Sequence, residues 1–186
     1  LFEMPDRRGA IGLLATMLTK DTRQRSAADV AEFIEEVGGS FHPVSGNNCF
    51  GLAAEVLPTD AGRALTVLAQ AAGSAAFRAK TFALERDAQF AGLREDADDV
   101  VTLARKLRRK KFFGTYPLAL DPQGDEAGVQ SLRPTDLVAL YRRLVVAPYA
   151  GLAVAGDFDP RRLAPRLKAW LAKLPRGPMP RTSARF

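Results

Sequence analysis

His42 and Cys49 are the residues of this sequence best suited to bind a metal or to act in nucleophilic catalysis, and each is the single member of its type. One cysteine excludes an internal disulfide and a zinc cluster built from several thiolates. One histidine excludes any site that needs two imidazoles from this chain, and it leaves His42 as the only possible base of a serine triad. We therefore expect His42 to be a partly exposed strand residue and Cys49 to behave as a small apolar residue.

Carboxylates gather in three groups, at residues 35–36, 85–87 and 96–99, that could supply acid–base chemistry or bind a hard cation. Calcium and magnesium sites usually draw oxygen ligands from a loop that is punctuated by glycine. No such loop accompanies these groups. We interpret them as charged side chains on helix surfaces and expect no metal site.

A run of cations, RKLRRKK, occupies residues 105–111 of a chain whose net charge is +6. Such a run can bind nucleic acid or anionic lipid, but aromatic residues adjoin it only at Phe112 and Phe113, and no base-reading motif accompanies it. We favour a solvated helix end or a rim that steers acidic peptides, and we expect no nucleic-acid partner. The predicted rim consists of Arg105, Arg108, Arg109, Lys110 and Lys111.

The apolar segment GAIGLLATML, residues 9–18, follows Arg7 and Arg8 and so imitates a signal peptide. Polar and charged residues follow it at 19–23 in place of small cleavage-site residues, which argues against export by this segment. Because the chain opens on Leu1 rather than Met, we expect it to be a piece of a longer protein, so an exported and a cytoplasmic location both stay open. No apolar run approaches ~18 residues, so no membrane span is expected.

Residues 9–19 are apolar on all sides, which predicts a buried helix. Small side chains at Gly12, Ala15, Thr16 and Thr19 recur with helical spacing and form one stripe on it. Glycine within a helix costs about 1 kcal/mol relative to alanine, so a packing reason is expected at Gly12. The stripe predicts either close packing or a hollow against this helix.

Periodicity, caps and turn residues predict the remaining elements. Helices are expected at 27–37, 60–72, 80–111 with a break near 96–99, 134–145 and 160–173. Strands are expected at 40–44, 49–57 and 149–155, with the first two joined as a hairpin, and residues 112–132 are expected to be irregular. The predicted fold class is α+β, with a mainly antiparallel sheet covered on one face by helices. We expect a single lobe at 1–174 and a proline-rich linker or tail at 175–186.

The order of these elements, with several short blocks, resembles one lobe of the M16 metallopeptidases, the family of insulinase, pitrilysin and mitochondrial processing peptidase. The blocks are TKDTRQRSA after the first helix, E-x-x-G-G-S-F after the second, YPL in the irregular connection and VAGDF near the end. The resemblance covers nearly the whole chain and implies a LuxS/MPP-like lobe.

In active members of this family the first helix carries H-x-x-E-H, in which two histidines one turn apart bind zinc and the glutamate activates water. The matching positions here are Gly12, Ala15 and Thr16, and a glutamate ligand on the long helix would fall near Gly92. None of these residues can perform its counterpart's role. The resemblance therefore implies a peptidase fold without the zinc site, and no cofactor is expected on this chain.

The facing lobe of active members supplies an arginine and, seven residues later, a tyrosine that bind the scissile carbonyl region. Arg109 and Tyr116 have this spacing. The surrounding FFGTYPL matches a different segment of the family, so we expect the true pair, where one exists, in a following lobe.

The first functional hypothesis is a non-catalytic lobe that helps to enclose or recognise unfolded peptide together with a second M16 lobe or an active, zinc-bearing subunit. Extended peptides bind exposed sheet edges through backbone hydrogen bonds. We assign this edge to the second predicted strand, at Cys49, Phe50, Gly51, Leu52 and Ala53. The alternatives are an active zinc metallopeptidase and a binding module that uses the basic surface.

Overall fold

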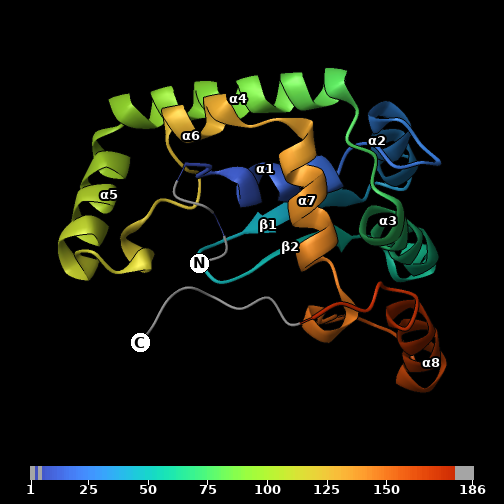
Figure 1. The fold of residues 1–186 in the computed structure, drawn as a ribbon. Helices are drawn as coiled ribbons and strands as arrows, with labels where there is room; N and C mark the ends of the chain where they lie inside the picture. Colours follow the sequence, from blue (N-terminus) through green and yellow to red (C-terminus); the bar gives the residue numbers. More distant parts are fainter. Residues whose placement is uncertain (1–2, 4–5, 179–186) are drawn as a thin grey trace.

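The computed structural model describes residue 3 and residues 6–178 of the chain. Helix α1 (Ala10–Leu18) lies at the centre of the fold, between α4 (Ala79–Asp98), α7 (Pro134–Leu144) and a hairpin of two strands (Figure 1). Its residues Leu13, Leu14 and Met17 are completely buried. The predicted buried helix is therefore confirmed, because its apolar surface is covered by packing partners on several sides.

The hairpin joins β1 (Ser40–Ser45) to β2 (Phe50–Glu55) in antiparallel register, with Ser40 opposite Glu55 and Ser45 opposite Phe50. Phe50 and Leu52 pack against the core around α1, while His42 is exposed opposite Ala53. The alternation of the sequence thus separates a covered face from a solvated one. The α+β class is confirmed, with a sheet of two strands in the described part of the chain.

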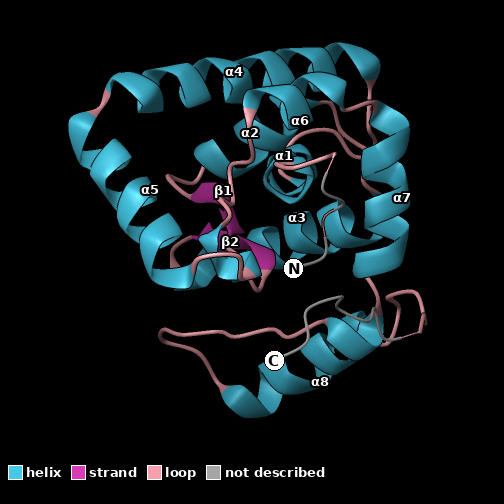
Figure 2. Ribbon diagram, turned by 60° about the vertical axis from the view of Figure 1, so that its left-hand side comes forward, coloured by secondary structure: helices cyan, strands magenta, loops and turns pink. Residues whose placement is uncertain are grey.

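Local capping sets the bounds of several helices. Ser26 and Asp29 form a reciprocal capping box at the start of α2 (Ala27–Glu35). Asp99 ends α4 in an extended conformation and accepts N–H bonds from the first turn of α5 (Val100–Phe113). The predicted break near 96–99 therefore lies at Asp99, where α5 turns away from the end of α4 (Figure 2).

Three further helices complete the fold: α3 (Ala61–Ser74), α6 (Glu126–Ser131) and α8 (Pro160–Leu171). Single 3-10 turns lie at Pro58–Asp60, Pro117–Ala119 and Ala147–Tyr149. None of the helices in the described ranges is both long and apolar enough to cross a membrane.

Two predictions about irregular and extended segments were wrong. Residues 149–155 form no strand: Tyr149 ends a 3-10 turn and residues 150–155 are irregular. A groove of about 370 Å³ separates residues 152–158 from β2, so the backbone of this segment forms no ladder with the hairpin. Residues 112–132 are not wholly irregular, because Asp125 caps the short helix α6 by accepting the N–H of Gly128 at 2.8 Å.

The predicted linker at 175–186 lies outside the described residues from 179 onward. At its described start, the carbonyl of Pro175 accepts the N–H of Ala147 at 2.8 Å, and the preceding Leu174 is buried.

Candidate functional site

Thr16 of α1 and Gly92 of α4 line the same cavity, which has a volume of about 290 Å³. Gln89 and Gln123 line it too, together with Glu85 and Asp96. Two of the four positions that the resemblance matches to the family's zinc site are therefore brought together around a polar hollow.

Gly12 and Ala15, the other two positions, are packed. Ala15 is completely buried, and a Cβ atom at Gly12 would lie 3.5 Å from the carbonyl oxygen of Pro122. The side-chain amide of Gln89 closes this region by donating to the carbonyl oxygens of Gly9 at 3.1 Å and Gln123 at 2.8 Å. The stripe of small residues is thus close-packed at Gly12 and Ala15 and hollow at Thr16.

The two carboxylates at the cavity are held by lysines. Glu85 lies 2.9 Å from Nζ of Lys20. Lys106 bridges α4 and the connection after α5, since its Nζ lies 3.0 Å from Asp96 and 2.9 Å from Asp121. Burial alone lowers the pKa of Lys106, but hydrogen bonds to these two carboxylates outweigh it and raise the pKa above the ordinary value. The negative charges of Glu85 and Asp96 are therefore each balanced by a lysine ammonium group.

The residues around the cavity do not fit zinc. Zinc sites use imidazole, thiolate or free carboxylate ligands, usually three or four of them. No group of three such residues in the described part of the chain is placed to hold a metal ion. The single histidine lies on the exposed face of the hairpin and not at this cavity.

The predicted peptide-binding residues border two hollows beside β2. Cys49, Phe50, Gly51 and Leu52 line an apolar cavity of about 250 Å³ whose far wall includes Val145, Val146 and Trp170. Ala53 lines the adjoining groove between β2 and residues 152–158. The outer edge of β2 therefore faces concave, mainly apolar surface.

The register determines which backbone groups reach that edge. The N–H of Gly46 bonds to the carbonyl of Cys49 at 2.9 Å, and hydrogen-bonded pairs alternate with non-bonded pairs along an antiparallel ladder. The backbone groups of Phe50, Leu52 and Ala54 therefore point away from β1. Opposite Leu52, Pro43 of β1 has no N–H, so the outer edge of β1 lacks a donor at its centre.

The predicted basic rim lies on α5. Arg105, Arg108, Lys110 and Lys111 are exposed, whereas Arg109 is half-buried and donates to the carbonyl oxygen of Leu120 at 3.4 Å. That bond fixes the connection after α5 and gives Arg109 a structural partner.

Sequence reasoning missed the roles of Gln89 and Lys106, because their partners lie on distant segments and no local pattern marks them.

A family model described as insulinase (peptidase family M16) matches residues 1–121. Over 171 residues the chain is 26% identical to an uncharacterized zinc protease of Streptomyces coelicolor, covering 92% of this chain and 37% of that protein. The fold is similar to the peptidase M16 inactive domain from Pseudomonas fluorescens, with a TM-score of 0.84 and 21% identity over 96% of this chain and 44% of that one. It is also similar to a protease from Helicobacter pylori, with a TM-score of 0.87 and 15% identity over 99% and 45% of the two chains. The chain spans less than half the length of each.

Proposed function

Because the chain belongs to the insulinase family, peptidase family M16, we propose that it is a non-catalytic lobe that helps to enclose or recognise a peptide substrate. It acts with a second M16 lobe or with an active, zinc-bearing subunit. The lobe occupies residues 1–174, and residues 175–186 serve as a proline-rich linker or tail.

The observation that carries this proposal is the composition of the cavity between α1 and α4. Thr16 and Gly92 stand at positions that match zinc ligands in the family, and the carboxylates of Glu85 and Asp96 are paired with lysines. A zinc ion there would lack imidazoles, and it would compete with two ammonium groups for the carboxylates. The chain's own residues thus support recognition rather than hydrolysis.

The relatives support the requirement for a second lobe. Each of those compared is more than twice as long as the segment that this chain matches. A lobe with no hydrolytic groups contributes to proteolysis only by holding substrate near a site that another lobe provides.

Peptide binding is assigned to the outer edge of β2. This edge presents the backbone groups of Phe50, Leu52 and Ala54, and the neighbouring hollow admits apolar side chains of a bound strand. Backbone hydrogen bonds supply affinity in strand addition, and such hollows supply selectivity. We therefore expect binding of extended, unfolded peptides with alternate apolar residues.

The proposal is tested by titrating the purified protein with unfolded peptides in a calorimeter, with and without a zinc-bearing homologue encoded alongside. We expect binding in at least one arrangement, no stoichiometric zinc in the purified protein and no hydrolysis by it alone. Absence of binding in both arrangements overturns the chamber role. Stoichiometric zinc with chelator-sensitive hydrolysis supports an active metallopeptidase instead.

Hydrogen exchange at single amides locates the peptide. Bound peptide is expected to slow exchange at Phe50, Leu52 and Ala54, whose N–H groups point outward, and to leave Gly51 and Ala53 unchanged because they already bond to β1. Slowed exchange at Phe41 and Ser45 would place the peptide on β1 and overturn the assignment. A salt-sensitive gel shift with nucleic acid would favour the basic-surface module.

A further inference from the structure

Residues 151–156, GLAVAG, have the alternation of a strand but no strand partner in the structure. No N–H or carbonyl group of residues 151–158, all of which are described, bonds to another backbone group. The outward backbone groups of Phe50, Leu52 and Ala54 on β2 are likewise unpaired. Two unpaired stretches of backbone therefore lie on opposite sides of the groove beside β2.

The two hollows beside β2 show the direction of this segment. The apolar cavity lies between the start of β2 and residues 144–152, whereas the groove lies between the end of β2 and residues 152–158. Leu52 and Leu152 border both hollows. Leu152 therefore stands across from Leu52, and the segment runs parallel to β2. Parallel strands need a long crossover connection, which the helices between the two supply.

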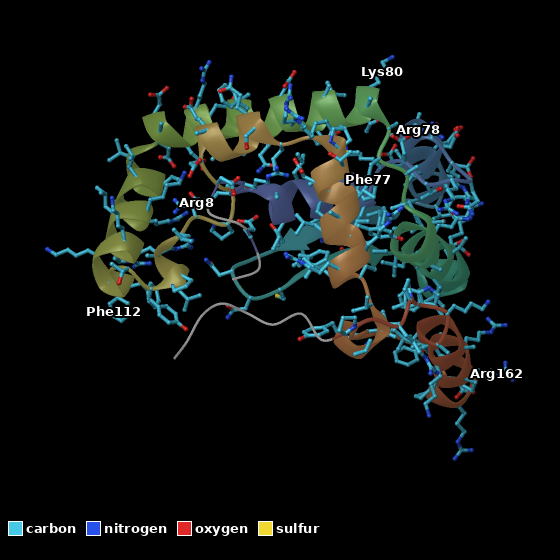
Figure 3. All side chains as sticks on the ribbon, viewed as in Figure 1. Arg8, Phe77, Arg78, Lys80, Phe112 and Arg162 are labelled. Atoms are coloured by element: carbon cyan, nitrogen blue, oxygen red, sulfur yellow. The ribbon has the colours of Figure 1, made fainter. Side chains whose placement is uncertain are left out.

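The segment belongs to an arm formed by residues 147–175. The base of the arm is closed by a backbone hydrogen bond of 2.8 Å from the N–H of Ala147 to the carbonyl of Pro175. Helix α8 lies within the arm and has no buried residue. Arg162 on this helix points away from the body of the protein (Figure 3). The arm is thus fastened at its base, while its backbone opposite β2 is unpaired.

We propose that residues 151–156 close onto β2 as a third, parallel strand, with Leu152 beside Leu52, and that this strand competes with peptide for the same edge. Gly156 ends the segment with a φ of 138°, a conformation that other residues rarely adopt, and lets the chain turn from the sheet toward α8. The inference rests on the proposed function, because it assigns an internal competitor to the peptide-binding edge.

Closure pairs polar backbone groups and covers apolar side chains. Neighbouring residues of parallel strands point to the same side, so Leu152 and Val154 turn toward the covered face to which Leu52 already contributes. Leu65 and Leu68 of α3 line the groove on that side. Val154 is 41% exposed in the structure, so it has apolar surface to bury on closure.

Disulfide trapping tests the closure. In a Cys49→Ser background, Ala53→Cys and Ala153→Cys place two thiols on the solvated face of the closed pair, at a Cα separation of about 4.8 Å that a disulfide spans. Oxidised glutathione is expected to link them. Ala53→Cys with Ala155→Cys is the matched control, because Ala155 lies about 6.6 Å further along the strand. Absence of the link, or equal linking in the control, overturns the closure.

The linked protein tests the competition. A synthetic peptide in which leucine alternates with serine and lysine is titrated into the oxidised and the reduced forms of the same double variant. We expect the linked form to bind at least about tenfold more weakly, because its β2 edge is occupied. Equal affinities overturn the competition. If the reduced form and the wild type bind no peptide, the proposed function and the competition both fall, whereas the yield of the disulfide still decides the closure.

Hydrogen exchange of the wild-type chain supplies an independent test. In the closed form the N–H groups of Ala153 and Ala155 donate to β2, so we expect them to exchange slowly. Those of Leu152 and Val154 point away from β2 and are expected to exchange freely. Val154→Asp is expected to remove the protection of Ala155, because it turns a carboxylate toward apolar side chains of α3. Ala153→Asp, on the opposite face, is expected to preserve it. Equal exchange at all four amides overturns the closure.

Discussion

The side-chain amide of Gln89 donates a hydrogen bond of 3.1 Å to the carbonyl oxygen of Gly9, so α4 holds the start of α1 across 80 positions of sequence. The same amide nitrogen bonds to Gln123 at 2.8 Å. One residue thus joins three segments beside the polar cavity. This contact therefore helps to set the position of α1 relative to α4.

Replacing Gln89 with alanine is expected to lower the free energy of unfolding by about 1–2 kcal/mol, because two backbone carbonyls lose their donor. Urea denaturation measures the effect. Gln130→Ala, at an exposed position of α6, is the control and is expected to change stability by less than about 0.5 kcal/mol. Equal effects of the two variants would show that the amide of Gln89 holds nothing in place.

Asp21 is a second internal tie. Its side chain is 2% exposed, and its Oδ1 atom accepts the N–H of Ala27 at 2.9 Å and lies 3.4 Å from Arg78. We expect Asp21→Ala to destabilise the protein by about 2–3 kcal/mol, since a charged acceptor is lost from a buried position.

Asp87→Ala is the matched control for Asp21, because the Asp87 side chain is 70% exposed and pairs only with the adjacent Arg86 among the contacts described. Its loss is expected to cost less than about 1 kcal/mol. Chemical denaturation compares the free energies of unfolding of the two variants. An Asp21 variant as stable as the control would contradict a structural role for this carboxylate.

Gly92 and Gly124 are expected to respond to alanine in opposite directions. A Cβ at Gly92 meets nothing within 4 Å, and this position lies inside α4, so Gly92→Ala is expected to stabilise by about 0.5–1 kcal/mol. Gly124 has φ +86, and a Cβ there would lie 2.5 Å from the carbonyl oxygen of Arg8. Gly124→Ala is therefore expected to cost more than about 1 kcal/mol. Thermal unfolding of both variants shows whether each substitution raises or lowers the melting temperature. Destabilisation by Gly92→Ala would contradict the open space found around this position.

Features determined within a few residues could be predicted from the sequence. The capping box of Ser26 and Asp29 and the break at Asp99 depend on bonds spanning three residues, and the turn after Ser45 fixes the hairpin register. Residues 149–155 could not be predicted in the same way, because alternation describes the faces of a strand and not whether a neighbour pairs with it.

The candidate site was predictable only in part. The resemblance identified Thr16 and Gly92, which border one cavity, but not Gln89, whose partners lie 80 and 34 positions away. Similarly, the cations of α5 were evident, whereas the outward direction of Leu107 depends on the ion pairs of Lys106 on the opposite face. Periodicity gives the spacing of a stripe, and tertiary contacts decide where it points.

The stability of α5 is expected to depend on pH through Asp99. The hydroxyl of Thr102 and the N–H groups of Val101 and Thr102 bond to its carboxylate, and they hold the pKa of Asp99 below its ordinary value of 3.8. A lowered pKa in the folded state means that the ionised group stabilises the fold fully above pH 3.8. This contribution is lost as the pH falls through the lower, folded value.

The stability difference between wild type and Asp99→Asn should therefore be largest near pH 6 and shrink toward pH 2. Urea denaturation over this pH range measures the difference, and Asp98→Asn controls for the loss of one negative charge. A difference that grows on acidification would contradict the capping role, because protonation can only remove an acceptor that the helix uses in its ionised form.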